Sequence, residues 1–125
     1  MRHLKAKVDA GADYIMTQMF FDNSKYFQFV KNCREVGIQV PIVPGLKPLT
    51  TKKQLTVIPR IFHVDLPTEL SLEVMKCKTD AEVEEIGTSW LLQQSKELKE
   101  FGVPVLHYYT LGKPKVIWNV VKELI

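Results

Sequence analysis

Three apolar runs in this 125-residue sequence contain, or lead into, polar side chains of the kinds that recognise ligands. These side chains are Thr17 and Gln18 in the first run, the loop from Lys47 to Gln54 after the second, and Tyr109, Thr110 and Lys113 at the end of the third. In parallel α/β folds the carboxyl ends of strands and the following loops converge, and chemistry collects there. We therefore expect these groups to share one end of a sheet.

Gln18 is the most informative of these residues, because it stands in the apolar run YIMTQMFF. A glutamine in such a place either finds hydrogen-bond partners on neighbouring strands or faces a ligand. Its amide presents one acceptor oxygen and two donor hydrogens, which suits a planar ligand edge that alternates donors and acceptors. A pterin ring and a nicotinamide carboxamide are edges of that kind. The sequence alone leaves both interpretations open.

Other kinds of chemistry find little support. We see no nucleophile paired with a base, no paired carboxylates and no glycine-rich phosphate loop, so the residues favour recognition. The net charge of +3 is spread along the chain, which argues against nucleic-acid and membrane-surface partners. Two cysteines without metal-ligand spacing fit a reducing compartment. With neither a leader pattern nor a membrane-spanning run, we expect a cytoplasmic protein.

Hydrophobic periodicity predicts three strands that alternate with helices. The predicted strands are residues 14–19, 40–43 (closed by Pro44-Gly45) and 103–109; the predicted helices are residues 3–10, 26–37, a short one around Gln54 that Pro59 interrupts, 67–77, 80–101 and 113–124. Strands that are apolar on both faces belong to a parallel sheet covered on both sides. Three strands are few, and a complete eight-stranded barrel needs roughly 250 residues. We therefore expect the C-terminal portion of something larger.

The runs LKAKVDAGADYIMTQMFFD, VPIVPGLKPL and LHYYTLGK, in this order and spacing, resemble the C-terminal half of methylenetetrahydrofolate reductase. The resemblance covers residues 2–125. It implies that residues 1–125 form one partial domain, the C-terminal half of a (β/α)8 TIM barrel. It also implies an oxidoreductase of one-carbon and methionine metabolism, in which NAD(P)H reduces 5,10-methylenetetrahydrofolate to 5-methyltetrahydrofolate through FAD.

The same resemblance implies roles for individual residues. It places Gln18 against the folate pterin and, in the other half-reaction, the nicotinamide. The remaining implied substrate contacts are Gln54, Tyr109, Leu111 and Lys113, and the implied contacts near FAD are Lys7 and His3. Lys113 stands where many relatives have arginine, and a lysine lacks the planar fork of a guanidinium. The family's general-acid glutamate lies in the N-terminal half, so we expect no catalytic residue here and an inactive isolated chain.

Plainer interpretations stand beside these roles. Lys7 is also consistent with a solvated helix face, and Gln54 with an exposed helix residue. Tyr108 and Tyr109 must point to opposite faces of a strand, so only one of them can face a ligand. A different function is a non-catalytic half-barrel that self-associates or binds a partner to cover its open sheet edges, and we expect a homo-oligomer. An unrelated barrel enzyme for phosphorylated substrates is disfavoured, because no glycine-rich loop follows the last strands.

Overall fold

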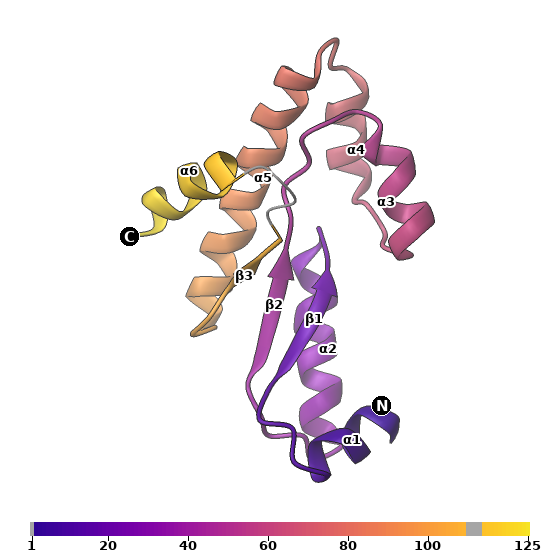
Figure 1. Cartoon of the computed structure of the whole chain (residues 1–125), viewed down its shortest axis with the longest axis vertical. Helices are drawn as coiled ribbons and strands as arrows, with labels where there is room; N and C mark the ends of the chain where they lie inside the picture. Colours follow the sequence, from indigo (N-terminus) through magenta and orange to yellow (C-terminus); the bar gives the residue numbers. More distant parts are fainter. Residues whose placement is uncertain (1, 110–113) are drawn as a thin grey trace.

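The computed structural model describes residues 2–109 and 114–125. The described chain consists of helices and strands that alternate except between β2 and β3, where three helices follow one another (Figure 1). In chain order they are α1 (Arg2–Asp9), β1 (Ile15–Met19), α2 (Asn23–Glu35), β2 (Ile42–Leu46), α3 (Gln54–Phe62), α4 (Thr68–Met75), α5 (Asp80–Phe101), β3 (His107–Tyr108) and α6 (Pro114–Leu124). No helix among the described residues is both long enough and apolar enough to cross a membrane.

The described strands form one parallel sheet in the order β1-β2-β3, as the alternation of strands and helices predicted. The prediction that Pro44-Gly45 closes the second strand is wrong, because β2 runs through both residues to Leu46. β3 is also shorter than the predicted strand over residues 103–109. Pro104 has no N–H to donate to a ladder, and pairing with β2 begins only at His107.

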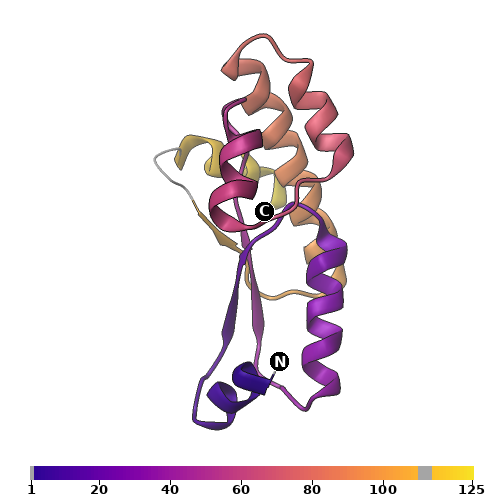
Figure 2. The ribbon, with the colours of Figure 1, turned by 90° about the vertical axis from the view of Figure 1, so that its right-hand side faces the viewer.

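One face of the sheet is covered and the other is open, so the prediction of cover on both sides is wrong for the described residues. Figure 2 shows α2 running alongside the strands on one side. Ile15, Ile42 and Leu46 contribute to a core on that side, together with Tyr26 and Cys33 of α2 and Leu91 and Leu98 of α5. On the open face Tyr14 is 57% exposed and Met16 is 41% exposed. Two apolar side chains therefore lie in solvent there.

A second core lies above the sheet in the view of Figure 1, where α3 and α4 pack beside the first half of α5. Its buried members are Met19, Phe21, Leu49, Ile58, Leu70, Val74, Cys77 and Val83. The prediction that Pro59 interrupts the helix around Gln54 is wrong, because α3 continues to Phe62. A proline removes one hydrogen bond of a helix. Burial of Ile58, which is 2% exposed, favours the helix despite that loss.

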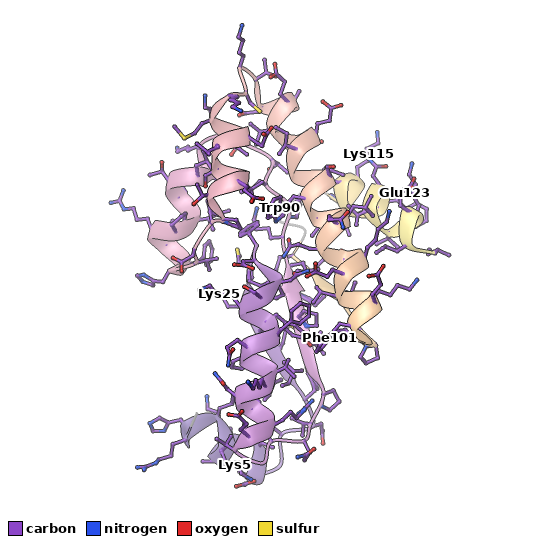
Figure 3. All side chains as sticks on the ribbon, turned by 180° about the vertical axis from the view of Figure 1, so that it is seen from behind. Lys5, Lys25, Trp90, Phe101, Lys115 and Glu123 are labelled. Carbon is purple, nitrogen blue, oxygen red and sulfur yellow. The ribbon has the colours of Figure 1, made fainter. Side chains whose placement is uncertain are left out.

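The long helix α5 ties both cores together. Thr79 caps its first turn by accepting the Glu82 N–H, and Gly102 ends it in the left-handed conformation at φ 101°. Trp90 and Phe101, labelled in Figure 3, mark where it meets the chain around α2. The Trp90 indole N–H donates to the Phe21 carbonyl at 2.8 Å. The rings of Phe101 and Phe27 are in contact, with their centroids 4.5 Å apart.

Candidate functional site at the carboxyl ends of the strands

Thr17 and Gln18 occupy an irregularity in the pairing of β1 with β2. Met16 pairs with Val43 and Met19 pairs with Gly45, so three steps along β1 match two along β2. Pro44 lies at this point in β2 and cannot donate to the ladder, because proline has no N–H. The extra residue in β1 is a β-bulge, a feature that re-aims side chains and is frequent beside active sites.

The Gln18 side chain is exposed, as is Met16 two residues before it. Its amide makes no hydrogen bond to any residue in the described part of the chain. A buried amide satisfied by neighbouring strands is therefore not what the structure contains. The acceptor oxygen and both donors of Gln18 are available to a ligand at the open side of the sheet.

Tyr109 directly follows β3, and its side chain reaches across β2 to the bulge in β1. Its hydroxyl donates to the Thr17 carbonyl at 3.2 Å, and its ring stands edge-on to the His107 ring with centroids 4.6 Å apart. Tyr108 takes the other direction, because its hydroxyl lies 2.8 Å from Ser95 Oγ on α5. Burial raises the pKa of the Tyr108 hydroxyl. The prediction that these two tyrosines face opposite sides of the strand is confirmed.

Gln54 lies at the start of α3 and is half-buried. Its Oε1 atom accepts the N–H groups of Thr50 at 2.7 Å and Thr51 at 3.2 Å. The Gln54 side chain therefore holds the loop between β2 and α3 in place, and Gln54 is not a freely exposed helix residue. Any ligand contact from Gln54 would use its amide N–H groups rather than its oxygen.

His3 and Lys7 lie on α1, at the opposite end of β1 from the bulge (Figure 1). Both side chains are exposed, and their spacing of four residues places them on one face of the helix. The structure does not bring them together with Gln18, Gln54 and Tyr109. Leu111 and Lys113, the other two predicted contacts, lie outside the described residues.

Lys47 is a residue of this site that sequence reasoning noticed only as the start of a loop. It follows β2, yet it is only 5% exposed, and its Nζ donates to the Pro48 carbonyl at 3.1 Å. Burial lowers the pKa of its ammonium group. No carboxylate of the described residues forms an ion pair with it. A lysine between Leu46 and the apolar Pro48-Leu49 was the signal for this burial.

A groove of about 690 Å³ lies elsewhere, between the start of α2, the segment before α4 and the middle of α5. Asp22, Asp65, Glu69 and Glu97 are among its lining residues, and Gln18 and Tyr109 are not. Lys25 also lines the groove, but four carboxylates against one ammonium group make it a poor place for an anionic ligand such as a folate or a dinucleotide. Among the described residues there is no cluster of three or more side chains that could hold a metal ion.

Comparison with known proteins agrees with the resemblance of the sequence motifs. The family model of methylenetetrahydrofolate reductase matches residues 1–125. The chain is 34% identical over 127 residues to a probable methylenetetrahydrofolate reductase (NADPH) of Caenorhabditis elegans, covering 99% of this chain and 19% of that protein. It is also 34% identical to the 5,10-methylenetetrahydrofolate reductase of Salmonella typhimurium, covering 98% of this chain and 42% of that protein.

A solved structure shares the fold over nearly the whole chain. It is an uncharacterised protein from Clostridium thermocellum that binds two copies of 5-methyl-5,6,7,8-tetrahydrofolic acid. The TM-score is 0.71 at 19% identity, with 98% of this chain and 46% of that chain covered. This chain thus spans less than half the length of these relatives and of this structural neighbour. The match of the family model over all 125 residues shows that the chain belongs to the methylenetetrahydrofolate reductase family.

Proposed function

We propose that this chain supplies the folate- and nicotinamide-recognising part of a reductase that converts 5,10-methylenetetrahydrofolate to 5-methyltetrahydrofolate with NAD(P)H and FAD. Family membership supports the reaction. The observation that carries the role of this part is Gln18, whose exposed amide lies in a bulge at the carboxyl end of β1 without a partner in the described chain. The structural neighbour from Clostridium thermocellum binds 5-methyltetrahydrofolic acid, which fits a folate ligand.

Gln18 would serve two planar ligands in turn. The edge of a pterin and the carboxamide of a nicotinamide both alternate hydrogen-bond donors with acceptors, and one amide can bind either. An amide held on a strand rather than on a loop is well positioned for this, since strand positions are fixed by the ladder on both sides of the bulge. In this proposal Gln18 binds and orients, and it transfers no proton.

FAD would supply the two-electron carrier between the two substrates. The described residues fit the phosphates of FAD better than its ring. Lys7 is basic and His3 is polar, and both are exposed on one face of α1. Lys7 forms no ion pair within the described residues, so its charge is available to an anion. Two contacts are few against the entropy lost when a ligand of that size is immobilised. We therefore propose that FAD binding and catalysis need the N-terminal half of the barrel.

The direct test is a titration of the purified 125-residue chain with 5-methyltetrahydrofolate, followed by ¹H–¹⁵N NMR. We expect a saturable shift of the Gln18 side-chain NH₂ signals. Gln18→Ala should weaken binding about three- to tenfold, the loss of one or two hydrogen bonds. Gln39→Ala, at an exposed position outside the strands, is the matched control and should bind as the parent chain does. Equal affinity of Gln18→Ala and the parent chain would remove Gln18 from the site.

The reaction itself is tested by reconstitution. The chain is mixed with a separately expressed N-terminal portion of the Salmonella relative, and oxidation of NAD(P)H is followed with FAD and 5,10-methylenetetrahydrofolate present. We expect activity and bound yellow flavin in the mixture and neither in the chain alone. An active, flavin-loaded preparation of the chain alone would contradict the proposal that the other half is needed.

A second function, a non-catalytic unit that self-associates through its sheet, is favoured by the open face. Tyr14 and Met16 are exposed there at 57% and 41%, and β1 has a free edge in the described sheet. Met16→Lys should then give a smaller particle by light scattering after size exclusion. If this is the main role, the chain should associate with itself and show no response to 5-methyltetrahydrofolate. An unchanged particle size in Met16→Lys would exclude association through this face.

A further inference from the structure

Hydrogen bonds that involve side chains fix the backbone at Thr17 and Gln18, where the regular main-chain pairing of β1 with β2 is interrupted. The Gly45 N–H donates to Thr17 Oγ1 at 2.9 Å, and the Tyr109 hydroxyl donates to the Thr17 carbonyl at 3.2 Å. The regular pairing lapses between Met16 and Met19. Two hydrogen bonds, one from the Gly45 N–H of β2 and one from the Tyr109 side chain just after β3, thus hold Thr17 where the bulge interrupts the main-chain bonds.

Gly45 makes this arrangement possible because it has no side chain. A Cβ atom there would lie 2.6 Å from the Thr17 carbonyl oxygen and 2.7 Å from Tyr109 Cε2, closer than real Cβ contacts. The close approach lets the tyrosine ring cross β2 and reach β1. The His107 ring, edge-on to the Tyr109 ring with centroids 4.6 Å apart, supports the tyrosine ring.

We propose that Thr17, Gly45 and Tyr109 are positioning residues that fix the peptide carrying Gln18 and so direct its amide toward the substrate. The inference deepens the proposed function and rests on it. The Thr17 carbonyl and the Gln18 N–H belong to one peptide unit, so the hydrogen bond from Tyr109 restrains the backbone of Gln18 itself. Tyr109 then acts through Gln18, because its hydroxyl hydrogen is engaged with Thr17 rather than with the ligand.

Tyr109→Phe removes one hydroxyl and leaves the ring in place. Tyr108→Phe is its matched control, since it also removes one hydroxyl, from a bond to Ser95 on the covered side of the sheet. Backbone ¹⁵N relaxation of Gln18 is measured in the 125-residue chain without ligand. We expect Tyr109→Phe to increase the motion of the Gln18 N–H and Tyr108→Phe to leave it unchanged. Unchanged Gln18 relaxation in Tyr109→Phe, or equal changes in both variants, would overturn the inference.

Thr17 gives a second test with a rescue. Thr17→Val keeps the shape but removes the acceptor of the Gly45 N–H, whereas Thr17→Ser keeps the acceptor. We expect faster hydrogen exchange at Gly45 in Thr17→Val and protection restored in Thr17→Ser. Failure of serine to restore protection would count against the inference, because the hydroxyl would then not be what holds the strands.

Ligand binding completes the test. If the parent chain binds 5-methyltetrahydrofolate, Tyr109→Phe and Thr17→Val should each weaken it about three- to tenfold, while Tyr108→Phe and Thr17→Ser should not. Unaltered affinity in both Tyr109→Phe and Thr17→Val would contradict the positioning role. If the parent chain does not bind, the proposed function is in question for this chain, and the relaxation and exchange measurements still decide whether these residues fix Gln18.

Discussion

The backbone of Leu49 lies directly against Gly87 of α5, and no side chain fits between them. A Cβ atom on Gly87 would overlap the Leu49 carbonyl oxygen and would lie 2.8 Å from its carbonyl carbon. The contact joins the segment that leaves β2 to the first half of α5, and both residues are buried. Gly87 therefore sets the distance between the site's loop and the helix layer.

Gly87→Ala tests this contact. Alanine in a helix interior ordinarily stabilises by about 1 kcal/mol relative to glycine. Here we expect the opposite, a loss of about 1–3 kcal/mol in the free energy of unfolding, because the buried backbone must move apart. Urea denaturation measures the change. Ser89→Ala, at an exposed position of the same helix, is the control and should be neutral or slightly stabilising. A stabilised Gly87→Ala would show that the contact is not tight in solution.

The helices were more predictable from the sequence than the strands. α5 has the predicted bounds because its signals are local, a threonine cap at Thr79 and a glycine stop at Gly102. The predicted second strand ends at residue 43, before the end of β2, because Pro44-Gly45 is typical of a turn. In the structure the missing N–H of Pro44 falls at the bulge, and the missing side chain of Gly45 admits Tyr109. Both residues are explained by neighbours distant in sequence, which single-sequence reasoning cannot place.

The candidate site was predictable to the extent that it depends on strand ends. Gln18 stands out as an amide inside an apolar run and Tyr109 as a polar group at the end of another, and the structure places Gln18 in the bulge and the Tyr109 hydroxyl against it. The hydrogen bonds from Gln54 to Thr50 and Thr51 were not foreseen, since a loop can be closed by any nearby acceptor. The burial of Lys47 was also missed, because a lysine after a strand is ordinarily solvated.

Gln54 can be tested for a role in binding apart from its role in the loop. Gln54→Glu keeps oxygen acceptors for Thr50 and Thr51 but loses the amide donors, whereas Gln54→Leu loses both. We expect Gln54→Leu to lower the free energy of unfolding by about 1–2 kcal/mol and Gln54→Glu to change it little. If Gln54 also contacts folate, Gln54→Glu should weaken 5-methyltetrahydrofolate binding at unchanged stability. Equal stability of the leucine variant would show that the loop bonds contribute nothing.

Gln18→Glu should impair both half-reactions in the reconstituted enzyme. A carboxylate accepts hydrogen bonds but donates none, so either ligand loses a partner worth about 0.5–1.5 kcal/mol. Flavin reduction by NAD(P)H and flavin reoxidation by 5,10-methylenetetrahydrofolate are followed separately by stopped-flow absorbance. We expect both to slow by comparable factors. Slowing of only one step would mean that Gln18 recognises one ligand and not two.

Lys47→Met should raise the free energy of unfolding at neutral pH. It should also make that free energy vary less with pH in the alkaline range. Burial lowers the folded-state pKa of Lys47 below its ordinary 10.5, so between these values the unfolded chain binds more protons than the folded one. The parent's free energy of unfolding therefore rises with pH across that window, and below it the full cost of burying the charged group remains.

Methionine fills a similar volume without a charge, and we expect Lys47→Met to gain about 1–3 kcal/mol below the window. The advantage should shrink as pH rises through the window and be smallest above 10.5, where the parent's lysine loses its charge in both states. Urea denaturation across this pH range measures it. Lys53→Met, at an exposed position nearby, is the control and should show no such dependence. A gain that stays constant with pH would show that the methionine acts through packing and that Lys47 is solvated.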